Sequence, residues 1–157
     1  DLMNQAEALK EDIISRLCAI RTPALRAEAL SHTLGVCQSM ALLAAARDLD
    51  PVLCMSMGLL HDCALYLQNC GHPGHARKSA LLAETILQEH GFALADIERI
   101  CTAISHHSDK SQRHDPYSEA LKDADVLARW LTARDAPLSD ARRMRMIAMC
   151  KELQLQP

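Results

Sequence analysis

The composition of this 157-residue chain predicts an all-α fold. Leu and Ala occur 24 times each, against 3 Val, 8 Ile and 4 aromatic residues. Leu and Ala favour helices, whereas β-branched and aromatic residues favour strands, so this imbalance argues against a sheet. The length is enough for one hydrophobic core. We therefore expect a compact single-domain bundle of about six to seven helices over residues 1–157.

Capping residues and Pro mark the helices of the first third of the chain. A first helix is expected over about residues 5–19. Thr22 followed by Pro23 predicts a second helix that runs to about Arg47, because Thr is a good N-cap and Pro suits the first turn. The apolar stripe of that helix is expected to contain Leu30, Leu34, Cys37, Ala41 and Ala44.

The middle of the chain repeats the same signals. Asp50 and Pro51 predict a third helix that runs through about Ala64. Residues 68–74 hold two Gly and one Pro, a composition typical of a loop. A fourth helix is expected over about 75–90, because the Gly that follows is a common stop signal.

Three more helices complete the expected fold. The first covers about residues 96–107 and is followed by a polar loop at 108–116. The next covers about 118–132, and the last covers about 139–153.

Histidine is the unusual residue of this sequence. Seven of the eight His lie between His61 and His114. His61 and Asp62 follow a Leu-rich and Met-rich run, and neighbouring helical residues point about 100° apart, so both can reach one ion beside the helix end. A lone His-Asp pair at a helix end is more often structural, with the His in the core and the Asp in solvent. Metal ligation becomes the better interpretation because further candidates lie on other helices, which a bundle can bring together. These candidates are His32, His75, His106, His107 and Asp125.

The order of four of these residues resembles a known signature. His32, then His61-Asp62 within Leu-Leu-His-Asp, then Asp125 within Ala-Asp-x-Leu is similar to the H…HD…D pattern of the HD superfamily of metal-dependent phosphohydrolases. The resemblance implies an HD-domain-like helical fold with a core at about 22–132 and flanking helices at both ends. It also implies that these four residues bind a first metal ion.

Some members of this superfamily hold two metal ions, and the resemblance extends to that pattern. His75 and the pair His106-His107 stand at the matching positions, and Asp62 would then bridge the two ions. His72 could take the place of His75 as a ligand. Of the pair His106-His107, either residue could be the ligand. We interpret His90 as a helix-end cap and His114 as solvated.

The donor set predicts the chemistry. Imidazole and carboxylate ligands suit Mn, Fe, Co, Ni or Zn, with Mg also acceptable. One or two such ions would activate water to attack a phosphate ester or anhydride, with His61 and Asp62 central to catalysis. Four cations lie near the candidate ligands in sequence and are candidates for contact with the substrate phosphate, although each also fits a solvated helix face. They are Arg77, Lys78, Lys110 and Lys122.

Several function classes are excluded or disfavoured. A net charge of −3 and four aromatic residues argue against nucleic-acid binding and against holding a base by stacking. The sequence lacks a G-x-S-x-G elbow and a P-loop. The loop after His107 lacks the Gly-Tyr-Pro element of the cyclic-dinucleotide hydrolases of this superfamily. The residues directly after His61-Asp62 also lack the basic residue that many members carry there. Both differences disfavour a cyclic dinucleotide as the substrate. We therefore expect a small phosphorylated substrate, a nucleotide held mainly by its phosphates.

The remaining signals concern location and two other functions. Seven Cys without a C-x-x-C pair suggest buried free thiols in a reducing cytoplasm. We expect no signal peptide, and no stretch approaching the ~20 apolar residues of a membrane span. A di-iron oxygenase on the HD fold would use the same ligands. A non-catalytic helical module, with a structural metal and a last helix that binds a partner, is the third interpretation.

Overall fold

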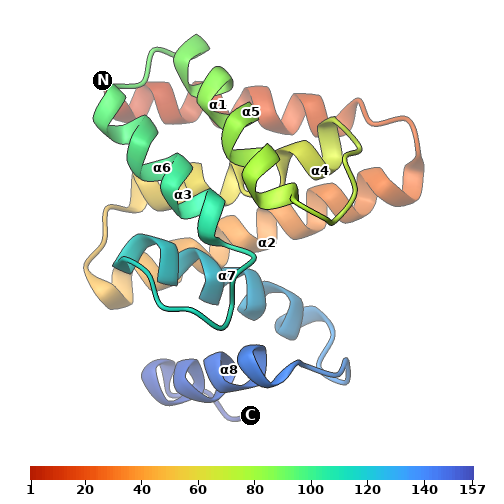
Figure 1. Ribbon diagram of the computed structural model, residues 1–157, viewed down its shortest axis with the longest axis vertical. Coiled ribbons are helices and arrows are strands. Elements are labelled where there is room, and N and C mark those ends of the chain that lie inside the picture. The colour runs from red at the N-terminus through yellow and green to blue at the C-terminus, as the bar shows by residue number, and fades with distance from the viewer.

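The computed structural model describes residues 1–157, and helices are its only regular secondary structure (Figure 1). This confirms the all-α prediction. The helices are α1 (Leu2–Cys18), α2 (Pro23–Arg47), α3 (Pro51–Leu60), α4 (Cys63–Leu67), α5 (His75–Glu89), α6 (Leu94–His106), α7 (Pro116–Thr132) and α8 (Asp140–Leu153).

The helix starts follow from capping chemistry. Helix α2 begins at Pro23 as predicted, and α3 begins at Pro51 because an oxygen of Asp50 accepts a 2.9 Å hydrogen bond from the Val52 amide. Helix α7 begins two residues earlier than expected, because Asp115 caps it and Pro116 occupies its first turn. Asp1 likewise caps α1, which begins at Leu2.

The predicted third helix is interrupted at the His-Asp pair. Helix α3 ends at Leu60, and the backbone of Asp62 leaves the helical region with φ −117° and ψ 22°. Helix α4 then starts at Cys63, so the prediction of one helix through Ala64 is wrong. The break fits the local bonding, because the Ala64 amide donates to the Ser79 hydroxyl of α5 at 3.1 Å.

Helix α2 lies at the centre of the bundle, between α3 and α7 (Figure 1). Its approach to α3 is close, because a Cβ on Gly58 would lie 3.0 Å from the Cys37 Cα. The predicted apolar stripe of α2 is wrong by about one position, since Leu30, Leu34 and Cys37 are half-buried and Ala41 is exposed. The buried residues are Ala29, His32, Thr33, Val36, Ser39, Met40, Leu43 and Ala44.

Helix α2 is also long and apolar enough to cross a membrane by length and composition. The expectation that no segment approaches such a span is therefore wrong for α2, because Ala and Leu occur around the whole helix. Half of its apolar window is buried inside the fold, as is typical of a core helix.

The seven cysteines are free, as predicted. Only Cys54 and Cys63 are buried, and Cys18 is exposed, so the expectation that the thiols are buried holds for part of the set. Burial raises the pKa of both Cys54 and Cys63 to about 12. These two thiols are therefore held in the neutral form.

Candidate metal centre

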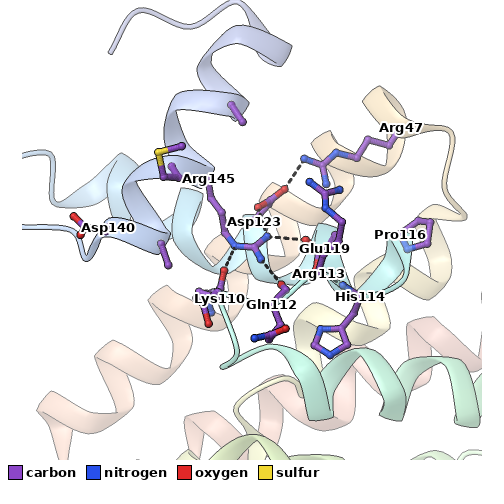
Figure 2. Close-up of a pocket in the computed structure, with 14 residues that line it drawn as sticks. Arg47, Lys110, Gln112, Arg113, His114, Pro116, Glu119, Asp123, Asp140 and Arg145 are labelled. Carbon is purple, nitrogen blue, oxygen red and sulfur yellow. Dashed lines mark hydrogen bonds and ion pairs between the residues drawn. The ribbon is translucent and has the colours of Figure 1, made fainter.

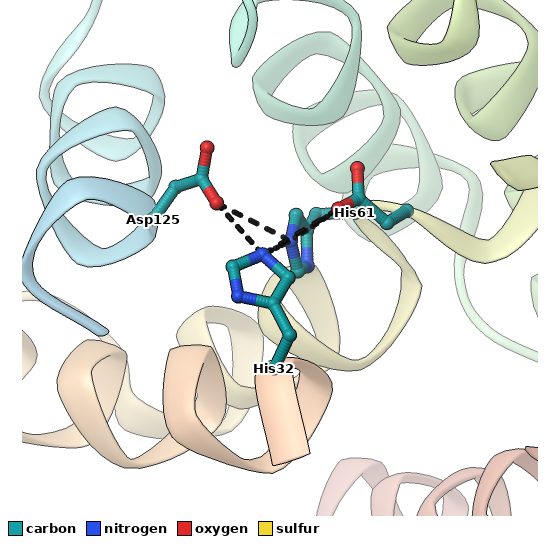
Figure 3. A group of neighbouring side chains, drawn as sticks. His32, His61 and Asp125 are labelled. Atoms are coloured by element: carbon teal, nitrogen blue, oxygen red, sulfur yellow. Dashed lines mark hydrogen bonds and ion pairs between the residues drawn. The ribbon is translucent and has the colours of Figure 1, made fainter. Parts of the chain in front are cut away.

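Three parts of the fold bring four predicted ligands together. His32 comes from α2, His61 and Asp62 from the break between α3 and α4, and Asp125 from α7. His32 Nε2 lies 3.1 Å from His61 Nε2 and 2.9 Å from Asp125 Oδ1. Asp62 Oδ2 lies 3.2 Å from His61 Nε2 and 3.5 Å from His32 Nε2. Figure 3 shows the His32 and His61 rings and the Asp125 carboxylate converging on one point.

This spacing fits a metal ion. Metal–ligand bonds of about 2.1 Å put neighbouring donor atoms roughly 3.0–3.4 Å apart, close to the distances in this group. Asp125 Oδ1 is buried and has no hydrogen-bond donor, although His32 Nε2 lies 2.9 Å away. A buried carboxylate oxygen without a donor is costly unless another positive group satisfies it. The four residues are therefore better suited to bind a metal ion than to hydrogen-bond only to one another.

A second group of donors lies on the other side of Asp62. His75 Nε2 lies 3.3 Å from Asp62 Oδ1, and His107 Nε2 lies 3.1 Å from the same oxygen. Asp62 thus presents Oδ2 to the first group and Oδ1 to the second. This arrangement is suited to a carboxylate that bridges two ions.

Backbone carbonyls orient three of the four rings. Nδ1 of His61 contacts the carbonyl of residue 58 at 2.7 Å, Nδ1 of His75 that of residue 72 at 2.7 Å, and Nδ1 of His107 that of residue 104 at 2.8 Å. A carbonyl only accepts, so Nδ1 carries the proton in the neutral ring and the Nε2 lone pair faces the cluster. This is the tautomer that a metal-binding His needs.

Burial and opposite charges act against each other on the two carboxylates. Burial alone would raise the pKa of Asp62, but its polar contacts with the rings of His61, His107 and His32 outweigh burial and hold that pKa far below its usual range. The pKa of Asp125 is lowered mainly by Lys110, again against burial. Both carboxylates are therefore anionic near neutral pH, as metal ligands must be.

Among the four cations predicted to meet phosphate, Lys110 contacts the cluster. Its buried ammonium donates to Asp125 Oδ2 at 2.8 Å and to the carbonyl of His107. Arg77 and Lys78 are exposed on α5. Lys122 is fully buried, and its ammonium donates to the Gln112 carbonyl and to Glu119. The Lys122 ammonium therefore binds the loop at residues 107–115 and does not contact the cluster.

The structure also divides the histidines. His75 joins the cluster, while exposed His72 contributes its carbonyl to the His75 ring. His107 joins it too, whereas His106 lies outside and stacks on His114 at a centroid distance of 3.7 Å. The expectation that His114 is solvated is therefore wrong. His90 is the C-cap residue of α5, as predicted.

Two residues near the site were not predicted from the sequence. The Tyr66 hydroxyl is buried without a hydrogen-bond partner, and burial followed by the charges of Asp62 and Glu28 raises its pKa. Its position four residues after Asp62 was the available sequence signal. Arg145 donates to the carbonyl of Lys110 at 2.9 Å. It lies next to the buried Met146 of α8, and nothing in its local sequence pointed to this loop.

Comparisons with known proteins agree with this arrangement. A solved structure from an uncultured Thermotogales bacterium, described as a predicted HD superfamily hydrolase, matches with a TM-score of 0.64 and 21% identity. The match covers 92% of this chain and 87% of that chain, and it shows the shared fold. No curated protein matches the chain. The HD domain family matches residues 29–130, which is more than half of the sequence. This range contains every residue of both donor groups. The chain therefore belongs to the HD domain family.

Proposed function

We propose that this chain is a metal-dependent phosphohydrolase that uses two divalent ions to hydrolyse a small phosphorylated substrate. The observation that carries the proposal is the position of Asp62, whose two oxygens face two separate groups of donors. We assign the first ion to His32, His61, Asp62 and Asp125, and the second to Asp62, His75 and His107.

The residues of the chain have distinct roles in this proposal. Divalent ions, when bound, polarise phosphoryl oxygens and lower the pKa of water, so no Ser or Cys nucleophile is needed. The backbone carbonyls that contact the His rings keep the Nε2 lone pairs directed at the ions. Lys110 holds Asp125 in place and supplies a cation beside the position of the phosphate.

The substrate is proposed to be a nucleotide held by its phosphates. All four aromatic residues are buried or half-buried, and the Trp130 ring packs under Arg134 at 3.7 Å, so no aromatic side chain is free to stack on a base. Free thiols support a reducing cytoplasm as the location.

Metal reconstitution combined with a substrate panel tests the proposal. The protein is stripped with a chelator, loaded with Mn, Fe, Co, Ni, Zn or Mg, and assayed for phosphate release from nucleotides and phosphomonoesters. We expect activity with a transition metal and a loss of at least about 100-fold in Asp62→Asn, because the bridging ligand is removed.

His90→Gln is the matched control, because His90 pairs with Asp12 at 2.8 Å, away from the cluster. It should keep wild-type activity and metal content. Wild-type protein that binds metal but releases phosphate from no member of the panel would refute the hydrolase proposal.

A second candidate is a di-iron oxygenase, favoured by the composition of the cluster. The two groups together contain four His and two Asp, the ligand set that the oxygenase interpretation requires. Iron content, oxygen consumption and an electron paramagnetic resonance signal distinguish it. Oxygen consumption that depends on iron, without phosphate release, would favour the oxygenase.

A further inference from the structure

Helix α8 lies at one end of the molecule, outside residues 29–130 that match the HD domain family (Figure 1). It packs on α7 and buries Met146 and Met149. Its residue Arg145 has a side chain only 12% exposed, so the charge of this guanidinium needs partners within the fold.

Arg145 fastens the loop at residues 107–115 to α7 and α8 (Figure 2). Its Nε donates to the Lys110 carbonyl at 2.9 Å, and its Nη2 donates to the Gln112 carbonyl at 3.1 Å. Its Nη1 pairs with Glu119 at 3.1 Å and with Asp123 at 3.0 Å, both on α7. One side chain thus holds two loop carbonyls against two carboxylates.

Lys110, whose carbonyl Arg145 binds, reaches the candidate metal centre with its side chain. The carbonyl of Lys110 is held by Arg145, while the ammonium of Lys110 lies 2.8 Å from Asp125 Oδ2. Lys110 therefore connects α8 with a carboxylate of the first donor group. The loop has no helix of its own, so these contacts, together with the bond from Lys122 to the Gln112 carbonyl, hold its backbone.

We propose that Arg145 is a positioning residue of the metal centre, which keeps the Lys110 ammonium on Asp125 by fixing the Lys110 and Gln112 carbonyls. The role of Asp125 as a metal ligand, and hence the effect on turnover, rests on the proposed function. The planar fork of Arg can serve two carbonyls and two carboxylates at once, which the single ammonium of a Lys cannot do. Helix α8 is then part of the site, although it lies outside the family match.

A purely structural role for Arg145 makes a different prediction, and Arg47 provides the comparison. Arg47 pairs with Asp123 at 2.7 Å and with Glu152 of α8 at 2.9 Å. It therefore ties α8 to α2 and α7, and it makes no hydrogen bond to the loop backbone. Arg47→Met should weaken the attachment of α8 without releasing Lys110.

Hydrogen exchange of the metal-free protein tests the positioning directly. We expect the amides of residues 108–115 to exchange at least about 10-fold faster in Arg145→Met and Arg145→Lys than in wild type. Arg47→Met should leave their exchange unchanged. Arg145→Lys keeps the positive charge and is the milder change, so it decides the outcome if Arg145→Met fails to fold. Unchanged loop exchange in Arg145→Lys, or equal acceleration in Arg47→Met, would overturn the proposal.

A double-mutant cycle tests whether Arg145 acts through Lys110. The Kd for Mn²⁺ is measured in Lys110→Met, Arg145→Lys and the double variant. Arg145→Lys should shift the Kd in the same direction as Lys110→Met, and it should add no further shift when Lys110 is already absent. Shifts that add in full would show that Arg145 acts by another route and would refute the proposal.

Turnover adds a third measurement once a substrate is found. Arg145→Lys should lower kcat/KM by about 10-fold or more in wild type and by less than about 2-fold in the Lys110→Met background. Absence of phosphate release from wild type would refute the proposed function alone, because the exchange and Mn²⁺ measurements need no turnover.

Discussion

His61 and His107 occupy the same position at the ends of their helices, and this position orients each ring toward the cluster. Each is the C-cap of its helix, where the last carbonyls lack helical donors, and each ring Nδ1 donates a hydrogen bond to the carbonyl three residues back. The sequence places a His pair at the end of α6, but neighbouring residues point about 100° apart. Only the packing of α6 decides that His107 faces Asp62 while His106 faces Ser118.

Protonation of His75 should oppose metal binding. Its hydrogen bond with Asp62 raises the pKa of His75 above its ordinary value, with burial acting the other way. The proton is therefore bound below that raised pKa and must be displaced by the metal. The affinity for Mn²⁺ should fall as the pH is lowered through this range, by up to about 10-fold per unit for one proton.

Titration calorimetry in buffers of different ionisation enthalpy measures the protons released. His75→Asn should release about one proton fewer than wild type below neutral pH. The His90→Gln variant is the control and should release as many as wild type. Equal proton release in all three proteins would contradict a ligand role for His75.

The lone hydroxyl of Tyr66 should cost stability in the metal-free protein. It is buried without a partner, so Tyr66→Phe should leave the free energy of unfolding unchanged or raise it by up to about 1 kcal/mol. Tyr117→Phe is the matched control, because the Tyr117 hydroxyl accepts a 3.0 Å hydrogen bond from the Asp50 amide. That variant should lose about 0.5–1.5 kcal/mol in urea unfolding. A loss of that size in Tyr66→Phe would mean that its hydroxyl is satisfied.

The elements were predicted well where local chemistry decides their ends and less well where packing does. Thr22-Pro23 and Asp50-Pro51 begin helices in the expected places because a cap and a Pro act within one turn. The break at His61-Asp62 carries no Gly or Pro, so the sequence held no signal for it. The stripe of α2 was misplaced because Ala and Leu cover this helix on several sides and weaken its periodicity.

The contact between α2 and α3 should depend on Gly58. A Cβ at this position would lie 3.0 Å from the Cα and 3.1 Å from the amide of Cys37, and this backbone cannot move aside without separating the helices. Gly58→Ala should lower the free energy of unfolding by about 1–3 kcal/mol and weaken Mn²⁺ binding at the adjoining His61.

Gly35→Ala is the control, because Gly35 lies on α2 but faces α7 instead of α3. Its Cβ would meet Ala128 at 3.5 Å, an ordinary contact, and Ala is the better helix former by about 1 kcal/mol. We therefore expect Gly35→Ala to be neutral or stabilising. Urea unfolding of both variants measures the difference, and equal stability would contradict the close approach.

At the scale of the whole molecule, the candidate site is an assembly of distant segments. Residue types and their order identified His32, His61, Asp62 and Asp125 as one group from the sequence, and the fold brings them together. The link from Arg145 to the loop was not predictable, because α8 follows the matched region and its Arg residues look alike in sequence. Long-range contacts of this kind are set by packing.

Metal should stabilise the folded molecule as a whole. An ion at 100 times its Kd adds about 2.7 kcal/mol to the free energy of unfolding, which should raise Tm by roughly 5–10 °C for a chain of this size. A chelator should reverse the shift, and Asp62→Asn should show little of it. Thermal unfolding with and without Mn²⁺ makes the comparison, and an equal shift in Asp62→Asn would place the ion elsewhere.

Anomalous diffraction from a crystal soaked in Mn²⁺ would reveal whether Asp62 bridges two ions. We expect two peaks, one among His32, His61, Asp62 and Asp125, and one among Asp62, His75 and His107. Binuclear sites of this kind hold their ions about 3.5–4 Å apart. A single peak, or none at these residues under saturating Mn²⁺, would show that Asp62 does not bridge two ions.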